Sequence, residues 1–277
     1  MKKKYDNNDI TIIIVAYFPN KKILSSLIKS IPNNIAIIII QNCNSDLKNI
    51  SKLKKNLRII KTKKNLGNGA GINIGFKNMH THFCLYLDID ILLENNFFQN
   101  LIKRINSKID FSILIPNINN KYSPAKLIEN YDAEGSVMFF NMKKFSEDFK
   151  FDEKFFLYYE ETDFFFKCKI TNRKIYIDPN LLAKHNRASS IKIKNYEYNI
   201  VYLRMWHFMW SKFYFYKKNF NYLIAIQKTF IEFIKDLIMM IVFAFKIDKH
   251  NFFIRLYRIS GLLCSYIGIK SYLRFSK

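Results

Sequence analysis

Paired cysteines, long apolar runs and the pattern of a signal peptide are all missing from this sequence of 277 residues. Its four cysteines are far apart and form no CxxC pair, which excludes the common zinc and dithiol motifs and favours a reducing compartment. The most apolar window near the C-terminus, LIMMIVFAF, has nine residues and cannot cross about 30 Å of hydrocarbon as a helix. The basic N-terminus, MKKKYDNNDI, lacks the apolar core and cleavage site of a signal peptide. We therefore expect a cytoplasmic protein.

Acidic residues are also scarce, since 22 Asp and Glu face 45 Lys and Arg and leave a formal net charge of +23. Such an excess favours partners that carry phosphate, whether nucleotides, nucleic acid or anionic lipid headgroups. A coding bias that enriches Lys, Asn, Ile and Phe together would produce part of the same excess. The few carboxylates that occur in apolar surroundings are the residues that most need an explanation.

Apolar runs and helical patterns alternate through the first two thirds of the chain. Continuous β-branched runs such as TIIIVAY suit strands that are covered on both faces. The predicted strands are 11–17, 36–42, 57–62, 83–90, 111–117, 136–141 and 174–179, and the predicted helices are 21–31 and 69–79. This order predicts an α/β fold with a mixed, mostly parallel sheet flanked by helices.

The composition changes near residues 195–200, where short strands give way to long aromatic and basic stretches. We expect an α/β domain over 1–195 and a basic, aromatic-rich helical region over 196–277. Residues 201–277 contain 13 Lys and Arg against 3 Asp and Glu. A basic helix with an apolar face suits an anionic membrane surface, although a helical subdomain or an oligomer interface would bury the same faces.

Polar side chains follow the predicted parallel strands at their carboxyl ends, where ligands of such sheets bind. Tyr17, Gln41, Asn42, Asp88 and Asp90 all fall at these ends. Carboxylate oxygens select Mg²⁺ or Mn²⁺, which proteins often hold together with substrate phosphates. The DID pair is therefore a candidate site for a divalent cation, and two solvated loop aspartates are the alternative.

A second group of acids, Glu160, Glu161 and Asp163, lies in the aromatic segment YYEETDFFFK. Carboxyl groups crowded beneath apolar cover have raised pKa values, as a general base requires. Helix capping or solvation would explain the same acids. Further along, His185 is on its own most simply a satisfied polar residue.

The glycine-rich segment KNLGNGAGINIG, residues 64–75, leads into a predicted helix whose N-terminus would suit an anion. It is neither a P-loop nor a GxGxxG motif. A tight turn with a packing glycine explains it nearly as well.

The motifs of this chain, taken in order, resemble those of the family 2 glycosyltransferases. They are Tyr17, NLGNGAGINIG, DID, EGSVMFF, FDEKFFLYYEETDFFFK and a histidine 24 residues after Glu161. Within that family the sequence looks most like bacterial rhamnosyltransferase-type enzymes, and the resemblance covers about residues 10–190. It implies a GT-A fold and an inverting transfer of a sugar, with rhamnose one candidate, from a nucleoside-diphosphate-sugar. The implied acceptor is a hydroxyl of a bacterial surface glycan, such as lipopolysaccharide, lipooligosaccharide or capsule.

The resemblance also implies roles for individual residues. The nucleotide-binding set would be Tyr17, Gln41, Asn42, Asn65, Asn68, Gly69, Asn73 and Asp88. Mg²⁺ or Mn²⁺ would be held by Asp88, Asp90 and His185. The base that deprotonates the acceptor hydroxyl would be Glu161, next to Glu160.

Three positions depart from the family pattern. Gln41 replaces the usual acid at the end of the second strand, which puts the base preference in doubt. The usual Glu-Asp pair is Glu160-Glu161 here, so Asp163, which keeps the family's residue type, is a rival base. Lys167 replaces an arginine and offers a point charge in place of a bidentate fork.

Two other functions agree less well with the sequence. A sugar nucleotidyltransferase would want an N-terminal glycine-rich loop with a basic signature, whereas the first strand leads into AYFPNKK. A nucleic-acid-binding protein is permitted by the charge, but no known binding motif appears. We expect the partners to be a nucleotide-sugar donor and a glycan or lipid-linked glycan acceptor, and we expect no nucleic acid. An anionic membrane surface, on the inner face of the cytoplasmic membrane, is a further expected partner. The C-terminal helices could also form a homo-oligomer.

Overall fold

The computed structural model describes residues 4–43, 45–123, 126–186 and 197–274. These residues form two compact units. The first is built from Met1–Leu66, Ala70–Phe151 and Phe164–Lys192, and the second from Gly67–Gly69, Asp152–Asp163 and Ile193–Lys277, in their described parts. The second unit thus includes two internal segments besides the C-terminal region. The predicted domain boundary near residue 195 lies outside the described residues and stays a prediction.

The described strands of the first unit form one nine-stranded sheet in the order β3-β2-β1-β4-β8-β6-β9-β5, with β7 paired to β9. The strands are β1 (Ile10–Ala16), β2 (Ala36–Gln41), β3 (Leu57–Lys61), β4 (Phe83–Leu87), β5 (Ile91–Leu93), β6 (Ile113–Ile118), β7 (Ile128–Glu129), β8 (Val137–Asn141) and β9 (Ile175–His185). Only β5, β7 and β8 run against the common direction of these strands. The mixed, mostly parallel α/β sheet predicted from the sequence is confirmed.

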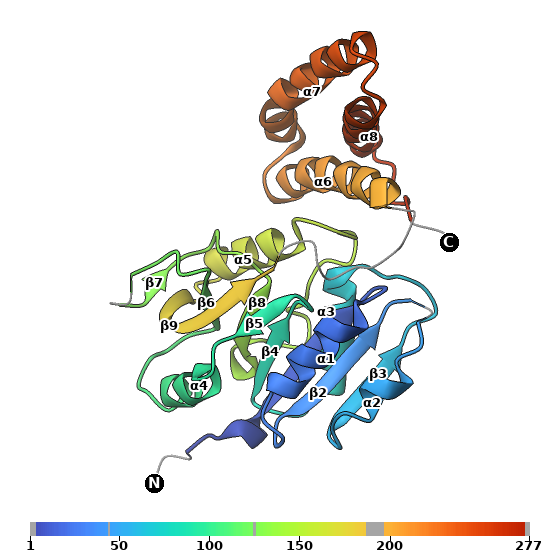
Figure 1. The fold of residues 1–277 in the computed structure, drawn as a ribbon. Helices are drawn as coiled ribbons and strands as arrows, with labels where there is room; N and C mark the ends of the chain where they lie inside the picture. Colours follow the sequence, from blue (N-terminus) through green and yellow to red (C-terminus); the bar gives the residue numbers. More distant parts are fainter. Residues whose placement is uncertain (1–3, 44, 124–125, 187–196, 275–277) are drawn as a thin grey trace. The chain divides into compact units, whose positions relative to one another are not determined.

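Helices cover both faces of this sheet (Figure 1). The five are α1 (Lys21–Ser30), α2 (Lys48–Ser51), α3 (Asn68–Asn78), α4 (Phe97–Ile105) and α5 (Glu160–Ile170). Successive residues of β1 alternate between two apolar clusters, with Ile12 and Ile14 in one and Ile13 in the other. Because both faces are buried, the strand reads as a continuous apolar run. A methyl group on Gly71 would lie 2.8 Å from Val15, so glycine is needed for α3 to approach β1.

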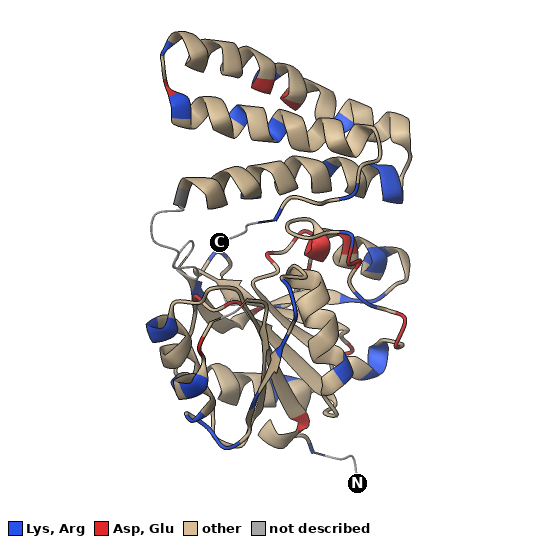
Figure 2. Ribbon diagram, turned by 90° about the vertical axis from the view of Figure 1, so that its right-hand side faces the viewer, with Lys and Arg blue, Asp and Glu red and all other residues tan. Residues whose placement is uncertain are grey.

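The second unit contains three long helices, α6 (Glu197–Asn219), α7 (Tyr222–Phe245) and α8 (Lys249–Tyr266), as predicted for this basic region. A small apolar cluster joins them, formed by Met209, Phe213, Ala225 and Leu262. Asn221 caps α7 by accepting a hydrogen bond from the Ile224 amide at 2.9 Å. Figure 2 shows that Lys and Arg positions outnumber acidic ones on these helices.

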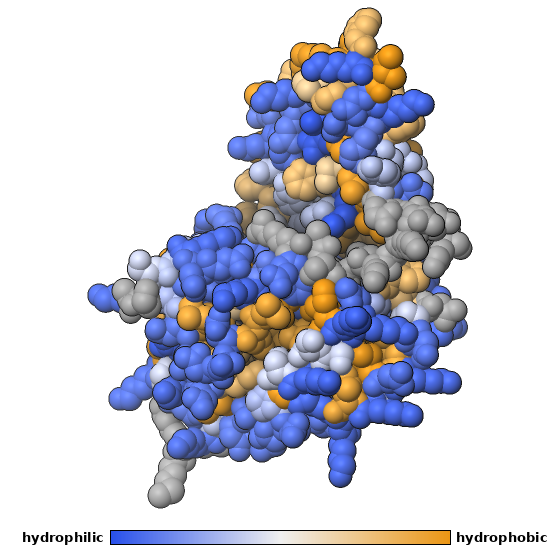
Figure 3. All heavy atoms as spheres, viewed as in Figure 1, coloured by the Kyte–Doolittle hydropathy of each residue, from blue (hydrophilic) through white to orange (hydrophobic). Residues whose placement is uncertain are grey.

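Hydrophobic side chains are exposed on the helical unit, and Figure 3 shows hydrophobic and hydrophilic side chains mixed on the face of this unit that it presents. None of the helices in the described part of the chain combines the length and the apolar character needed to cross a membrane.

Candidate active site

The loops that follow β1, β2 and β3 are joined at one edge of the sheet. The Asn42 amide donates to the carbonyl of Ala16 at 2.8 Å, and the Thr62 amide donates to the carbonyl of Gln41 at 3.1 Å. Because β1 to β4 are parallel, all four carboxyl ends meet at this edge. The structure thus brings the predicted strand-end residues to the edge where ligands of α/β sheets bind.

Asp88, Asp90 and His185 form a cluster at this edge, in which one ligand atom from each residue lies within 4.8 Å of the others. The chain turns after β4, and β5 then runs antiparallel to β9, with Ile91 opposite His185. This register sets His185 Nε2 3.4 Å from Asp90 Oδ1. Asp90 is only 3% exposed. Two carboxylates and an imidazole are a donor set that suits Mn²⁺ or Mg²⁺.

Glu134 completes the cluster and was not identified from the sequence. Its Oε1 lies 2.5 Å from His185 Nδ1 and accepts a hydrogen bond from the Ser136 hydroxyl at 3.2 Å. Hydrogen bonds with Asp90 and then Glu134 raise the pKa of His185 to about 9, against the opposing effect of burial. A carboxylate on Nδ1 fixes the ring so that Nε2 points toward Asp90. In the sequence, Glu134 is the glutamate beside glycine in EGSVMFF. Nothing in the pattern indicated that this glutamate would contact His185.

Asp88, the other carboxylate of the cluster, is held by its own strand and a neighbour. It accepts a hydrogen bond from the Tyr86 hydroxyl, and its amide donates to the Ser136 carbonyl at 2.9 Å. Tyr86 is buried, so this contact orients the carboxylate at the strand end.

Tyr17 and Asn65, both predicted to line the nucleotide, are brought together. Burial raises the pKa of the Tyr17 hydroxyl, and a hydrogen bond with the Asn65 side chain acts in the opposite direction. The Tyr17 ring packs edge-on against Phe18 at 4.9 Å between centroids. A half-buried aromatic ring at the strand edge is suited to stack on a base.

The Gln41 side chain organises its own loop. Its Nε2 donates to the carbonyl of Cys43 at 2.8 Å and to the carbonyl of Ser45 at 2.6 Å. The neighbouring Asn42 accepts a hydrogen bond at Oδ1 from the Thr62 hydroxyl at 3.1 Å. The Nε2 donors of Gln41 are thus engaged within the protein. Gln41 is therefore better placed to fix the shape of its loop than to hydrogen-bond to the edge of a nucleobase.

Asn73 is also engaged in a structural contact. Its Nδ2 donates to the Phe151 carbonyl at 2.9 Å and its Oδ1 accepts from the Phe151 amide at 3.0 Å. This reciprocal pair favours a role in holding the chain that follows Phe151. Lys167, at the arginine position of the family pattern, lies with Nζ 4.3 Å from the centre of the Phe149 ring.

Asn68 and Gly69 belong to the second unit and begin α3, directly after the glycine turn at Gly67. The Asn68 amide donates to the Phe156 carbonyl at 3.3 Å. Gly67 has a φ of 89°, and a methyl group there would lie 2.3 Å from the Phe156 oxygen. The turn is therefore packed directly on the FDEKFF segment.

The predicted acids lie after a strained stretch of the second unit. Tyr158 and Tyr159 have φ values of 64° and 66°, the left-handed region that costs about 1–2 kcal/mol for each non-glycine residue. Such strain concentrates at functional sites. Helix α5 then begins at Glu160, which is buried, whereas Glu161 is partly exposed.

Asp163 is bound by α6. Its Oδ2 lies 2.6 Å from Lys218 Nζ and its Oδ1 accepts from Asn219 Nδ2 at 2.8 Å. Lys218 also lies 2.9 Å from Asp152 Oδ2, which accepts from the Tyr214 hydroxyl at 3.0 Å. Burial opposes ionisation of Asp152, but the bonds with Lys218 keep its pKa below the usual value. These contacts favour Glu161 over Asp163 as the more accessible acid.

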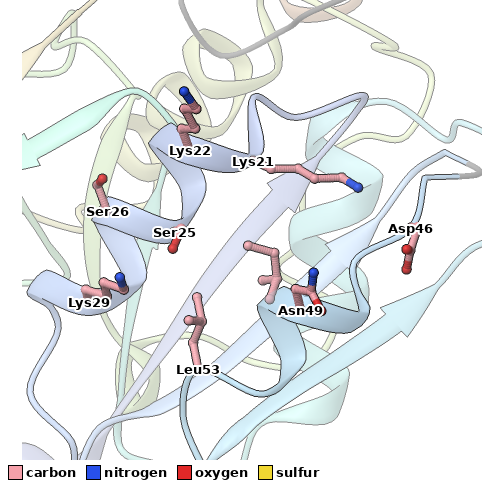
Figure 4. Close-up of a pocket in the computed structure, with 9 residues that line it drawn as sticks. Lys21, Lys22, Ser25, Ser26, Lys29, Asp46, Asn49 and Leu53 are labelled. Atoms are coloured by element: carbon pink, nitrogen blue, oxygen red, sulfur yellow. The ribbon is translucent and has the colours of Figure 1, made fainter.

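A cavity of about 450 Å³ lies between α1 and α2 (Figure 4). Its polar lining includes Lys21, Lys22, Lys29, Ser25, Ser26, Asp46 and Asn49. No residue predicted for the metal, the nucleotide or the base lines this cavity. It is separate from the cluster described above.

Comparisons with known proteins place the fold. A mannosyltransferase from Pyrobaculum calidifontis in complex with GDP-Man and Mn²⁺ has a TM-score of 0.54 and 9% identity, over 94% of this chain and 87% of that one. A fragment of S. aureus TarS in complex with UDP-GlcNAc has a TM-score of 0.51 and 14% identity, over 93% of this chain and 90% of that one. A longer TarS structure has a TM-score of 0.49 and 18% identity over 71% of this chain, which spans only 39% of that protein. The two likenesses with TM-scores above 0.5 confirm the GT-A fold expected from the sequence.

No curated protein matches the chain. The sequence pattern of glycosyl transferase family 2, however, matches residues 11–178. Because this match spans more than half of the chain, the protein belongs to glycosyl transferase family 2 and is a glycosyltransferase.

Proposed function

We propose that this protein is an inverting, metal-dependent glycosyltransferase that moves a sugar from a nucleoside-diphosphate-sugar to an acceptor hydroxyl. The observation that carries the proposal is the cluster of Asp88, Asp90 and His185 at the carboxyl edge of the sheet. Two proteins of similar fold bind nucleotide-sugars, and one of them also holds Mn²⁺. Because both are less than 25% identical to this chain, their likeness shows the fold, and the donor class is inferred by analogy.

Asp88, Asp90 and His185 would hold Mg²⁺ or Mn²⁺, which would supply a Lewis acid for the departing diphosphate. Glu134 would accept a hydrogen bond from Nδ1 of His185 and so leave Nε2 directed toward Asp90. Tyr17 would stack on the base, with Asn42 and Asn65 beside it.

Glu161 is the proposed general base. It would take the proton of the acceptor hydroxyl while that oxygen forms a bond to the anomeric carbon, and the bond from this carbon to the diphosphate would break. The nucleoside diphosphate leaves with the electron pair, and the configuration inverts because attack and departure occur on opposite faces. Asp163 is less suited because Lys218 and Asn219 occupy its two oxygens.

The acceptor of this proposal is a bacterial surface glycan, such as lipopolysaccharide, lipooligosaccharide or capsule, and rhamnose is one candidate for the transferred sugar. Both details come from the family resemblance of the FDEKFFLYYEETD segment. A lipid-linked acceptor would place the enzyme on the inner face of the cytoplasmic membrane.

A thermal-shift screen of nucleoside-diphosphate-sugars tests the proposal, with each donor measured in Mn²⁺, in Mg²⁺ and in EDTA. We expect one donor to raise the melting temperature only when metal is present. Asp90→Asn should abolish this shift, whereas Asp110→Asn, which removes an exposed acid paired with Lys144, should keep it. Glu161→Gln should retain the shift but lose transfer. Equal stabilisation in EDTA, or a normal shift for Asp90→Asn, would refute the metal site.

A further inference from the structure

Helix α7 presents a row of apolar side chains to solvent. The row consists of Leu223, Phe230, Ile231, Ile234, Ile238, Ile241 and Phe245, which we call the α7 stripe. Its members are 38% to 85% exposed and follow one another at steps that place them on one face of the helix. A monomeric protein rarely leaves such a contiguous row uncovered, so the stripe indicates an interaction surface.

The acids of α7 point away from the stripe. Asp236 is buried and accepts hydrogen bonds from Arg255 Nη1 at 2.8 Å and from Arg258 Nε at 2.7 Å. Glu232 pairs with Lys212 and lies 3.5 Å from Arg258 Nη2. Both negative charges of α7 are thus neutralised within the helical unit.

The charges that remain on the outside of α7 are positive. Lys228 and Lys235 are exposed and, seven residues apart, share one face of the helix beside the stripe. Lys246 and Lys249 are exposed where α7 ends and α8 begins. The outer surface of α7 therefore combines an apolar stripe with a flank of lysines.

We infer that α7 docks on the surface of an anionic phospholipid bilayer, with the stripe in the interfacial region and the lysines among the headgroups. This combination is the one that an interfacial amphipathic helix requires. Each lysine near an anionic surface strengthens binding by about fivefold. A second copy of the chain fits less well, because it would bring the same lysines to the interface with no outward acid of α7 to meet them.

This inference rests on the proposed function in one respect, which is that the acceptor is bound to the membrane. A bilayer-bound α7 would concentrate the enzyme where a lipid-linked acceptor lies. The docking itself needs neither donor nor metal, so it can be measured separately.

Co-sedimentation of the full chain with vesicles tests the docking in the absence of donor and metal. We expect binding to vesicles of phosphatidylcholine mixed with phosphatidylglycerol, and little binding to phosphatidylcholine alone. The triple variant Ile231→Ser/Ile238→Ser/Phe245→Ser should bind at least tenfold more weakly. Ile170→Ser, which removes an exposed isoleucine from the first unit, is the control and should bind normally.

A second pair of variants tests the charge. Lys228→Gln/Lys235→Gln should weaken binding by at least tenfold, whereas Lys52→Gln/Lys55→Gln removes the same charge from exposed positions elsewhere and should have a small effect. The inference is overturned if the stripe variant binds like the parent protein. It is also overturned if the parent is a dimer in solution that the stripe variant disrupts without loss of vesicle binding. Either result would leave the metal-dependent donor shift, and with it the proposed function, untouched.

Discussion

Lys218 and Asp163 form an ion pair with 2.6 Å between Nζ and Oδ2, and the same ammonium lies 2.9 Å from Asp152. One cation of α6 therefore binds carboxylates at both ends of the internal segment 152–163. That segment carries the candidate base Glu161. The C-terminal helices thus do more than extend the chain, because α6 holds the acidic segment in place within the second unit.

Replacement of Lys218 by methionine should destabilise the protein by about 3 kcal/mol, because it leaves the carboxylate of Asp163, only 4% exposed, without its cation. Transfer activity should fall as well, since the segment that carries Glu161 loses its anchor. Urea denaturation measures the first effect. Lys217→Met is the matched control: Lys217 is exposed, and its loss should change the free energy of unfolding by less than about 0.5 kcal/mol.

The double variant Lys218→Met/Asp163→Asn isolates the charge. It should recover part of the lost stability, because the uncompensated carboxylate is gone. If the double variant is no more stable than Lys218→Met alone, the lost packing of the lysine stem, and not the pair, explains the effect.

Glu134 should control how tightly the proposed metal site binds its ion. Glu134→Gln keeps an acceptor for His185 Nδ1 but removes the charge, and we expect metal affinity to fall by about 10–100-fold. Titration with Mn²⁺, followed by the paramagnetic resonance of the free ion, measures this affinity. Glu129→Gln is the control, since Glu129 is exposed and bonded to Tyr131. Unchanged Mn²⁺ binding by Glu134→Gln would show that His185 needs no orienting partner.

Gly67 and Gly268 both have left-handed backbones, with φ values of 89° and 79°, but their surroundings differ. A methyl group on Gly67 would lie 2.3 Å from the Phe156 oxygen, whereas one on Gly268 would meet nothing within 4 Å. Gly268→Ala should therefore cost about 1 kcal/mol of stability from the backbone alone. Gly67→Ala should cost at least about 2 kcal/mol more, because backbone must move. Equal urea midpoints for the two variants would contradict the close packing of the glycine turn.

The sequence predicted best what depends on local pattern. The run at 11–17 forms β1 and the pattern at 21–31 forms α1, because a continuous apolar run and helical spacing can both be recognised from neighbouring residues. Strand β9 extends to His185, beyond the predicted 174–179, because β5 pairs with its later residues. A three-residue strand such as β5 has no pattern of its own, so this extension could not be seen in advance.

The candidate site also contains residues that the sequence pattern predicted and residues that it could not predict. Asp88, Asp90 and His185 were predicted as a group, because family spacing relates them, and the structure brings their ligand atoms together. Partners chosen by tertiary packing were not predicted. Glu134 lies 51 residues from His185, and Lys218 lies 55 residues from Asp163. Neither contact leaves a periodic signal in the sequence.

His207 should make the stability of the helical unit depend on pH. It is fully buried, its Nε2 lies 2.8 Å from the Leu273 carbonyl, and its Nδ1 lies 3.1 Å from the Ser271 hydroxyl. Burial lowers the pKa of His207 to about 4, and the charge of Arg274 acts in the same direction. The folded state therefore keeps this imidazole neutral at a pH where an unfolded histidine already binds a proton.

The sign of the effect follows from proton binding. Between pH 6.5 and about 4 the unfolded state binds the proton and the folded state does not, so the free energy of unfolding falls as the pH is lowered through this window. The full effect is about 3 kcal/mol. His207→Gln, which can still donate to the Leu273 carbonyl but cannot titrate, should flatten this part of the profile in urea denaturation at successive pH values. His80→Gln, at an exposed position, should leave the slope unchanged. If the His207→Gln profile ran parallel to that of the parent protein, the buried imidazole would not be held neutral. The reason is that the free energy of unfolding changes with pH only where the folded and unfolded states bind different numbers of protons.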